Sequence, residues 1–218
     1  MKHVGMNVAA DAFVNSAITG INGGLVVLAA DDPSMHSSQN EQDSRFYGKF
    51  AMIPILEPSN QQEAYDMMPY AYSLSEQMRL PVLMRVVTRL AHSRAGVATT
   101  TPLAQNGLNP DSERTHWVLL PGNARRQYAS LVEKQTAILQ SAETSAYNRR
   151  CGNGGAKLGI VACGIAYNYV MECNAMQAGI PVLKVSQYPI PAEQIKALAA
   201  ECDSLLVAED GQPVVEEQ

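Results

Sequence analysis

The segment Ala29–Arg45, AADDPSMHSSQNEQDSR, places carboxylates, hydroxyls, amides, an imidazole and a guanidinium directly after an apolar run. An imidazole titrates near neutral pH, so His36 is the candidate for proton transfer. Ser38 and Gln39 beside it offer hydrogen-bond donors and acceptors to a ligand. The alternative is a solvated loop in which the aspartates and serines form turns. The segment therefore predicts either one wall of a binding site or a polar turn.

A second group of polar residues lies near the N-terminus, in the segment KHVGMNVAAD (2–11). His3 and Asn7 flank Gly5, a pattern that fits a loop at the edge of an active site. The same residues also fit the start of a helix with Asn7 as its N-cap. The sequence leaves both interpretations open.

The hydrophobic pattern predicts a parallel sheet that would position these groups. Residues 24–30 (GLVVLAA) and 80–90 (LPVLMRVVTRL) are apolar, β-branched runs typical of buried strands. A short strand within 51–60 and a helix capped by Ser59 lie between them and indicate a crossover connection. Pro69 predicts a kink or a break in that helix. Parallel strands end at one edge of a sheet, so the polar residues that close the second run should lie beside the first segment: Thr88, Arg89, His92, Ser93 and Arg94.

The chain as a whole is predicted to be an α/β protein in three parts. Residues 1–100 form a partial parallel-sheet domain, because a domain of ordinary size would have about one or two further strands at its start. Residues 101–155 form a linker with an amphipathic helix within 123–147. Residues 156–218 alternate strand and helix and predict a small, three-layer, doubly wound α/β domain. The apolar stripe of the linker helix comprises Tyr128, Leu131, Val132, Gln135, Ile138 and Leu139.

Several familiar chemical motifs are missing from the sequence. Gly164 follows a predicted strand, but ACGIAYN lacks the three glycines of a dinucleotide-binding turn. There is no P-loop, no His-Glu-x-x-His and no Gly-x-Ser-x-Gly. The spacing of the four cysteines fits neither a zinc site nor an iron–sulfur ligand run, so reduced thiols and no metal site are predicted: Cys151, Cys163, Cys173 and Cys202.

Composition excludes several classes of partner. The net charge of -5 provides no long-range attraction to nucleic acid or to anionic membranes. The apolar runs are strand-sized, far below the ~20 residues of a membrane span. The N-terminus lacks the apolar core of a secretory signal. We therefore predict a cytoplasmic globular protein with no nucleic-acid or membrane partner.

Six segments, in order along the chain, carry a resemblance to a known family. KHVGMNVAAD, GGLVVLAADDPSMHSSQNEQDSRFYGKFAMIPILEPSNQQEA and LPVLMRVVTRLAHS closely resemble the alpha subunits of the indolepyruvate:ferredoxin oxidoreductases. PGNARRQYASLVEK, LGIVACGIAYNYVME and LLVAEDGQPVVEEQ resemble later parts of the same subunit. These are thiamine diphosphate-dependent 2-oxoacid:ferredoxin oxidoreductases, and the resemblance spans essentially the whole chain.

The resemblance implies an activity and a set of partners. The expected reaction is the oxidative decarboxylation of arylpyruvates to acyl-coenzyme A, with electrons passed to ferredoxin. In the full-length enzyme it implies thiamine diphosphate with Mg²⁺, iron–sulfur clusters and a beta subunit. The implied fold is part of a pyrimidine-binding domain, followed by a domain similar to the transketolase C-terminal domain.

The same resemblance implies roles for particular residues. His36 becomes a candidate for proton transfer, and Ser38 and Gln39 become candidates for contacts with substrate or pyrimidine. His3, Gly5 and Asn7 would line the cofactor and substrate pocket. Glu209 and Asp210, at a strand end, would meet other domains or coenzyme A.

The resemblance also places much of the family's machinery outside this sequence. The glutamate that activates thiamine, the diphosphate- and magnesium-binding domain and the cysteine-rich cluster domain have no counterpart here. We therefore expect an internal fragment that is inactive and binds none of these cofactors by itself. The alternative is a non-catalytic interaction or scaffold protein derived from the family. An incomplete first sheet would expose apolar edges, which predicts a homo-oligomer.

Overall fold

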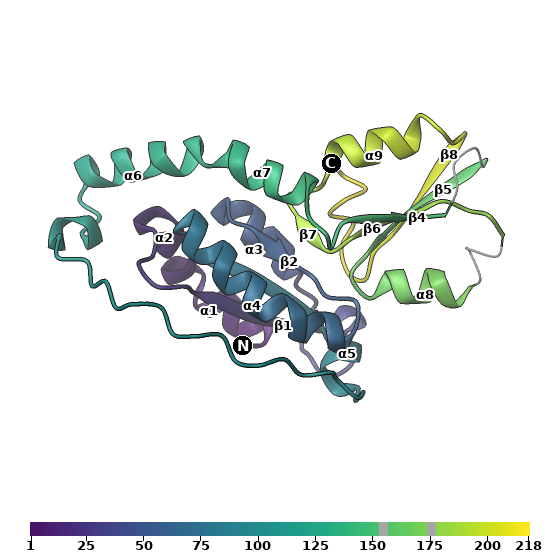
Figure 1. The fold of residues 1–218 in the computed structure, drawn as a ribbon, viewed down its shortest axis with the longest axis horizontal. Coiled ribbons are helices and arrows are strands. Elements are labelled where there is room, and N and C mark those ends of the chain that lie inside the picture. The colour runs from purple at the N-terminus through teal and green to yellow at the C-terminus, as the bar shows by residue number, and fades with distance from the viewer. Residues whose placement is uncertain (153–156, 174–177) are drawn as a thin grey trace.

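The computed structural model describes residues 1–152, 157–173 and 178–218. Figure 1 shows two α/β units joined by a long helical connection. The α/β fold class predicted from the sequence is confirmed. The first unit contains α1 (His3–Val8), α2 (Ala10–Thr19), β1 (Val26–Asp31), the short 3-10 helix η1 (Pro33–Met35), α3 (Ser44–Ala51), β2 (Ile55–Leu56), α4 (Gln61–Met78), β3 (Val82–Val87) and α5 (Thr88–His92).

The first sheet has the strand order β1-β3-β2-β7. β1 and β3 pair in parallel along their whole length, from Val26 opposite Val82 to Asp31 opposite Val87. β2 joins β3 in parallel, which confirms the predicted strand–helix–strand crossover. β7 (Gln187–Tyr188) comes from the C-terminal part of the chain and pairs antiparallel with β2. The second unit therefore completes the sheet of the first.

The N-terminus of α4 differs by one residue from the sequence prediction. Asn60, not Ser59, is the N-cap, and its side chain accepts a hydrogen bond from the backbone N–H of Glu63 at 2.9 Å. The Glu63 carboxylate in turn accepts the backbone N–H of Ser59 at 2.6 Å, which is a reciprocal capping arrangement. Pro69 lies inside α4, which is one continuous helix, so it does not divide the helix, and the alternative of a kink stays a prediction.

This cap gives a first testable prediction. Asn60→Ala is expected to lower the free energy of unfolding by about 1 kcal/mol, because the N–H of Glu63 loses its acceptor. Asn60→Asp keeps the acceptor and should leave stability within about 0.5 kcal/mol of the starting protein. Urea denaturation followed by circular dichroism measures both variants. Equal stability of the two would contradict the role of the cap.

The connection between the units packs against the first of them. It contains the 3-10 helix η2 (Arg114–Trp117), α6 (Pro121–Glu133) and α7 (Gln135–Glu143), so the single helix predicted here is two helices. α6 packs on α2. Of the predicted apolar stripe, Leu131 and Ile138 are buried, whereas Tyr128, Val132 and Leu139 are exposed.

The second unit is a doubly wound α/β sheet, as predicted. It contains β4 (Arg149–Cys151), β5 (Leu158–Cys163), α8 (Ala166–Glu172), β6 (Val182–Val185), α9 (Ala192–Ala199) and β8 (Ser204–Ala208). In the order β4-β6-β5-β8, the last three strands are parallel and β4 is antiparallel. α8 and α9 lie on opposite faces (Figure 1). The helix predicted here covered residues 165–179 and so extended beyond the end of α8. Its residues 174–177 lie outside the described residues.

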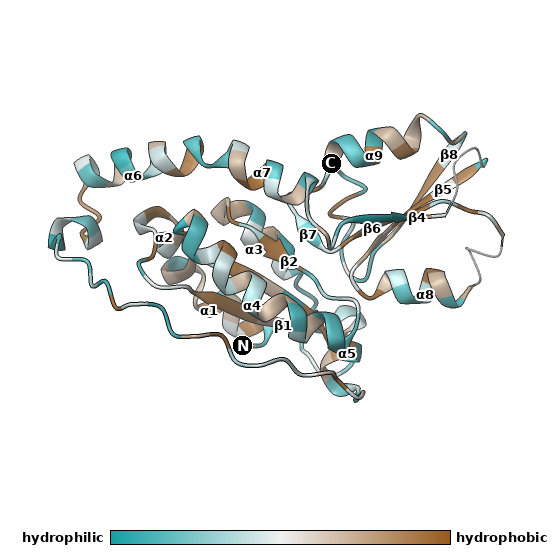
Figure 2. Cartoon of the chain, viewed as in Figure 1, coloured by the Kyte–Doolittle hydropathy of each residue, from teal (hydrophilic) through white to brown (hydrophobic). Residues whose placement is uncertain are grey.

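Apolar surface remains along β1 and the helices beside it. Figure 2 shows hydrophobic residues concentrated in β1, β5 and β8. Leu28 on β1 is 45% exposed, Phe50 on α3 is 75% exposed and Val8 on α1 is 88% exposed. Self-association, predicted from the sequence, stays a prediction. Among the described residues, no helix combines the length and the apolar character needed to cross a membrane.

Candidate functional site

A pocket of about 430 Å³ lies at the carboxyl ends of β1 and β3. We call it the strand-end pocket. The second unit contributes Tyr169 from α8 and Asp210 from the segment after β8, so both units form its walls. Open α/β sheets bind ligands at this edge. The pocket is lined by Pro33, Ser34, His36, Thr88, Arg89, Tyr169 and Asp210.

Asp32 holds the loop on one side of the strand-end pocket. Its carboxylate accepts hydrogen bonds from the backbone N–H groups of His36 at 3.1 Å and Ser37 at 2.8 Å. The hydroxyls of Ser38 at 2.6 Å and Thr88 at 2.7 Å also donate to it. The Ser38 hydroxyl, followed by the backbone of Ser37, holds the pKa of Asp32 well below its usual range. Asp32 is therefore an anion that fastens this loop to the end of β3.

The same loop contains two consecutive residues with left-handed backbone conformation. Ser34 has φ 64° and Met35 has φ 54°. Positive φ is uncommon outside glycine and concentrates at functional sites. The backbone N–H of Ser34 donates a hydrogen bond to the carboxylate of Glu41 at 2.8 Å. The carboxylates of Asp32 and Glu41 therefore both hold the strained turn. The position of His36 is therefore fixed by its backbone.

Next to the pocket lies a buried charge cluster, which we define by six side chains. Four carboxylates and two guanidiniums are brought together from β1, α3, β3 and the segments after β2 and β8. Both arginines are fully buried. The members are Asp31, Asp43, Arg45, Glu57, Arg85 and Glu209.

Arg85 connects the strand ends of the first unit to the second unit. Its Nε donates to Asp31 at 2.6 Å, and its Nη1 pairs with Glu57. Its Nη2 donates to the backbone carbonyl of Asp210 at 2.7 Å. Glu57 also accepts the hydroxyl of Tyr188 at 2.6 Å. One arginine thus joins β1, β2 and the segment after β8.

Arg45 makes a parallel set of contacts from α3. Its Nε donates to Asp43 at 3.0 Å and its Nη1 to Glu209 at 2.7 Å. Its Nη2 donates to the carbonyl of Gln212 at 2.8 Å. The sequence prediction that Glu209 meets another domain is confirmed by this contact, whereas contact with coenzyme A stays a prediction.

Burial and the neighbouring arginine charges shift the pKa values of the cluster's carboxyl groups in opposite directions. Burial raises the pKa of Asp31, and the attraction of Arg85 offsets only part of the rise. Burial also acts on Asp43, but Arg85 and Arg45 together outweigh it, and the pKa of Asp43 is lowered. Burial, with Cys163 and Glu57 nearby, raises the pKa of Tyr188 well above its usual value. Asp31 therefore binds a proton more readily than a free aspartate does.

Two glycines allow the second unit to approach the cluster closely. At Gly164, where φ is 48°, a Cβ atom would lie 2.6 Å from the Glu57 carboxyl carbon. At Gly211, where φ is 119°, a Cβ would lie 2.8 Å from both Arg85 and Asp43. Neither position has room for a side chain.

Some of the residues predicted from the sequence meet in this pocket. His36, Thr88 and Arg89 line it, which confirms that the two polar strand ends share one edge. Ser38 is bound to Asp32, and Gln39 is exposed outside the pocket lining. The exposed His92 and Arg94 also lie outside that lining, and the hydroxyl of Ser93 pairs with Gln61.

The N-terminal candidates lie elsewhere, on α1. His3 is buried, and within the described residues neither of its ring nitrogens has a hydrogen-bond partner. Asn7 accepts a hydrogen bond from the Tyr47 hydroxyl at 2.9 Å, and Gly5 packs beside Met1. Neither the loop nor the N-cap interpretation is correct, because α1 begins at His3 with Lys2 as its N-cap. None of the three lines the strand-end pocket.

The sequence analysis did not identify Tyr169 as part of the pocket, or Arg85 and Glu57 as members of the buried charge cluster. One signal was present for Arg85, because a single arginine interrupts the apolar run LPVLMRVV. A buried arginine requires carboxylate partners, so such a residue predicts buried acids at neighbouring strand ends. Tyr169 carried no comparable signal, since it comes from a distant helix.

The pocket offers groups for anion binding and proton transfer. The Arg89 guanidinium lies 5.6 Å from the centre of the Tyr169 ring and is itself exposed. Burial raises the pKa of Asp210, more than Arg85 lowers it. Together with the His36 imidazole, the site can hold a carboxylate and exchange a proton.

The described residues do not provide a metal site. No group of three or more histidine, cysteine, aspartate or glutamate side chains within them is arranged to hold an ion. The cysteines are free thiols in separate places, of which Cys163 is buried and Cys173 is exposed.

The fold has a counterpart among solved structures. It is similar to 2-oxoglutarate:ferredoxin oxidoreductase from Magnetococcus marinus, solved with 2-oxoglutarate, coenzyme A and succinyl-CoA bound. The TM-score is 0.68 at 14% identity, over 94% of this chain and 44% of that one. The chain therefore shares the fold of the matching part of this 2-oxoacid:ferredoxin oxidoreductase.

Curated sequences narrow the relationship further, although no family model matches the chain. Indolepyruvate oxidoreductase subunit IorA of Methanothermobacter thermautotrophicus is 42% identical over 225 residues, covering 100% of this chain and 36% of that subunit. The Archaeoglobus fulgidus subunit is 40% identical over 227 residues, covering 99% and 35%. The Thermococcus kodakarensis subunit is 39% identical over 227 residues, covering 100% and 35%. The chain is similar to these IorA subunits along essentially its whole length and spans about a third of theirs.

Proposed function

We propose that this chain supplies part of the active site of an indolepyruvate:ferredoxin oxidoreductase, with the strand-end pocket holding the carboxylate end of the substrate. The proposed reaction is oxidative decarboxylation of an arylpyruvate to its acyl-coenzyme A, with ferredoxin as electron acceptor. The observation that carries the proposal is the position of Arg89 and His36 in one pocket closed by both units. Its volume of about 430 Å³ falls in the range of small-molecule sites.

Arg89 is the residue proposed to bind the substrate carboxylate. Arg89 is the second residue of α5, which directly follows β3. Its guanidinium is exposed beside Tyr169. Within the described residues it forms no ion pair within 4.0 Å, although its charge acts to lower the pKa of Asp210 in the same pocket. A guanidinium presents paired N–H donors that match the two oxygens of a carboxylate. Arg89 is therefore available for an anionic ligand.

His36 is the residue proposed to move a proton at the substrate. Its backbone is held by Asp32 while its side chain lies at the exposed pocket wall. Asp210, which also lines the pocket, is the second candidate because burial raises its pKa. Ser38 and Gln39 stay proposals for contacts with substrate or pyrimidine, and His3, Gly5 and Asn7 stay weaker ones because they lie on α1, away from the pocket lining.

The described residues of this chain show no site for the metal-containing cofactors of the family. These residues contain no cluster of potential metal ligands and no group of neighbouring cysteines. We propose that the Mg²⁺ of thiamine diphosphate and the iron–sulfur clusters are bound by other parts of the whole enzyme. The beta subunit, ferredoxin and coenzyme A are likewise proposed partners of that whole enzyme.

The proposal is tested by Arg89→Met in the whole enzyme, purified with all its subunits. Loss of a charge-assisted bond to the substrate carboxylate should raise the KM for indolepyruvate at least about tenfold. The matched control is Arg94→Met, an exposed arginine that does not line the pocket. Its kinetics should equal those of the starting enzyme. Steady-state ferredoxin reduction measures both variants.

A second substitution separates catalysis from a purely structural role. His36→Gln should lower kcat about a hundredfold and flatten the acidic limb of the pH profile, because a general acid–base group is removed. Unchanged kinetics in both Arg89→Met and His36→Gln would contradict the proposal. That outcome would favour the alternative of a non-catalytic interaction or scaffold protein.

A further inference from the structure

Two walls of the strand-end pocket are joined through one buried carboxylate. Asp32 directly follows β1, and Thr88, the first residue of α5, directly follows β3. The residues before them, Asp31 and Val87, lie opposite each other in the parallel ladder of the two strands. Asp32 and Thr88 are therefore neighbours at the carboxyl edge of the sheet, where Asp32 is only 2% exposed.

The two carboxylate oxygens of Asp32 hold different groups. Oδ2 accepts the backbone N–H of Ser37 at 2.8 Å and the hydroxyl of Ser38 at 2.6 Å, both from the loop between β1 and α3. Oδ1 accepts the backbone N–H of His36 at 3.1 Å and the hydroxyl of Thr88 at 2.7 Å. The bond from Thr88 leaves the loop and connects it to the start of α5.

This connection lies between the two side chains that the proposed function uses. The Oδ1 atom of Asp32 is bonded on one side to the backbone of His36. On the other side it is bonded to Thr88, which immediately precedes Arg89 in α5. His36 and Arg89 both line the pocket, whereas Asp32 does not. A change in the Asp32–Thr88 contact would therefore change the separation of the imidazole and the guanidinium.

The Thr88 hydroxyl has a second acceptor that keeps it in place. It lies 3.0 Å from the backbone carbonyl of Asp31, at the last residue of β1. Valine has the same branched shape as threonine but no hydroxyl, so it would lose both contacts. Serine keeps the hydroxyl and can form both. The two substitutions at residue 88 thus separate the hydrogen bond from the space that the side chain fills.

Other bonds of the loop run to other partners. The Lys2 ammonium donates to the backbone carbonyl of Ser37 at 3.0 Å, and the Glu41 carboxylate accepts the backbone N–H of Ser34 at 2.8 Å. These contacts hold the loop to the N-terminal residues and to itself. Loss of the Thr88 hydroxyl would leave them intact and would release the loop from α5.

The charge on Asp32 makes the connection independent of pH near neutrality. Its hydrogen bonds, that from the Ser38 hydroxyl first, hold the pKa of Asp32 well below its usual range. An imidazole titrates between about pH 5 and 8, where this carboxylate stays ionised. Loss of the Thr88 contact should therefore lower the rate without changing the shape of the pH profile.

We propose that Asp32 and Thr88 are positioning residues that set the separation between Arg89 and His36. The inference rests on the proposed function, in which Arg89 binds the substrate carboxylate and His36 moves a proton. Arg89 then fixes one end of the substrate, and the Asp32–Thr88 contact keeps the loop, with His36, at the distance that proton transfer requires.

The test is steady-state kinetics of Thr88→Val in the whole enzyme with all its subunits. Its kcat with indolepyruvate should fall about tenfold or more, because a small misplacement of a reacting group is costly. Its KM should stay within about twofold, because Arg89 is unchanged. Thr88→Ser should restore kcat to within about twofold of the starting enzyme, and Thr88→Val should keep the pH profile of that enzyme.

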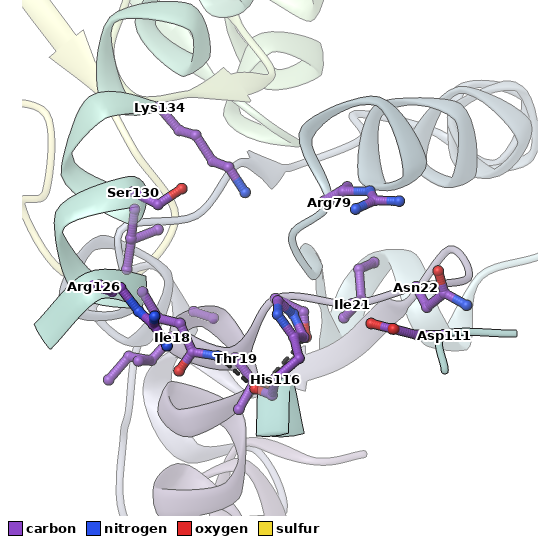
Figure 3. Close-up of a pocket in the computed structure, with 14 residues that line it drawn as sticks. Ile18, Thr19, Ile21, Asn22, Arg79, Asp111, His116, Arg126, Ser130 and Lys134 are labelled. Carbon is purple, nitrogen blue, oxygen red and sulfur yellow. Dashed lines mark hydrogen bonds between the residues drawn. The ribbon is translucent and has the colours of Figure 1, made fainter. Parts of the chain in front are cut away.

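Asp32→Asn is the second variant, because it replaces one of the two acceptor oxygens with an amide nitrogen. Since Asp32 does not line the pocket, a lower kcat in this variant cannot come from a lost contact with the substrate. The matched control is Thr19→Val. The Thr19 hydroxyl donates to the backbone carbonyl of Asn15 at 3.2 Å, and Thr19 lines a different pocket (Figure 3). This control should have the kinetics of the starting enzyme.

A double variant separates positioning from a general loss of structure. With His36→Gln already present, Thr88→Val should cause no further fall in kcat, because the group that it positions is absent. Circular dichroism verifies that each variant is folded. Unchanged kcat in both Thr88→Val and Asp32→Asn, no recovery in Thr88→Ser, or a multiplicative loss in the double variant would each overturn the positioning role. These outcomes leave the proposed function standing, which fails only if Arg89→Met and His36→Gln have no effect.

Discussion

Arg85→Met is expected to lower the free energy of unfolding by about 3–5 kcal/mol at neutral pH, the typical loss when one partner of a buried ion pair is removed. The substitution leaves the buried carboxylates of Asp31 and Glu57, which lie at the carboxyl ends of the strands on either side of β3, without their shared cation. It also leaves the backbone carbonyl of Asp210 without its donor. The contact between the two units should weaken together with the first sheet.

The loss should depend on pH in a direction that follows from Asp31. Its pKa is raised in the folded protein, chiefly by burial. Between the unfolded and the folded pKa, the folded state binds a proton that the unfolded state has released, so stability falls as pH rises through that window. Arg85 is the main group that opposes this rise. Without it the window extends to higher pH, and the deficit of Arg85→Met should be larger at pH 8 than at pH 5.

The control for this prediction is Arg150→Met. Arg150 pairs with Glu201 at 2.6 Å, but the two side chains are 32% and 40% exposed. Exposed pairs contribute about 0.2–1 kcal/mol, so this variant should remain close to the starting protein at both pH values. Guanidinium denaturation at pH 5 and pH 8 measures all three proteins. A deficit for Arg85→Met that is small, or that grows as pH falls, would contradict the ion-pair interpretation.

The strand ends that the sequence predicted correctly are those set by local pattern. The apolar runs before Asp31 and Thr88 are long enough to identify as strands, and parallel pairing then brings their polar ends together. The helix of residues 61–78 was likewise predicted from its period, with its N-cap placed one residue too early. Each of these elements was identified from residues that are close together in the sequence, within a single strand or helix.

The buried cluster could not be predicted in the same way, because its contacts join distant parts of the chain. Arg45 and Glu209 are separated by 164 positions, and Tyr188 and Glu57 by 131. In sequence, Asp43 and Arg45 resemble the solvated charges around them, and only the fold shows that they are buried. The strand predicted over residues 180–188 includes β7, but its pairing with β2 escaped prediction for a similar reason, because the two residues pair with a strand of the other unit.

Gly164→Ala is expected to lower the free energy of unfolding by about 2–4 kcal/mol, from a left-handed backbone and from overpacking. The added Cβ would lie 2.6 Å from the Glu57 carboxyl carbon. Glu57 has no freedom to move away, because Arg85 and Tyr188 hold its two oxygens. Gly122→Ala is the control, since this glycine lies in α6 with no atom within 4 Å of its Cβ position. It should be neutral or stabilising by up to about 1 kcal/mol.

The double variant Gly164→Ala with Arg85→Met separates contact with Glu57 from backbone strain. Both single changes act on Glu57, one by pushing against it and the other by releasing it. Once Arg85 is absent, the Glu57 side chain can move away from the new methyl group, and the overpacking part of the loss should disappear. The double variant should therefore be more stable than the sum of the single losses predicts, by about 1–2 kcal/mol, as expected for residues that share a partner. Strict additivity in denaturant unfolding would show that Gly164 is required only for its backbone conformation.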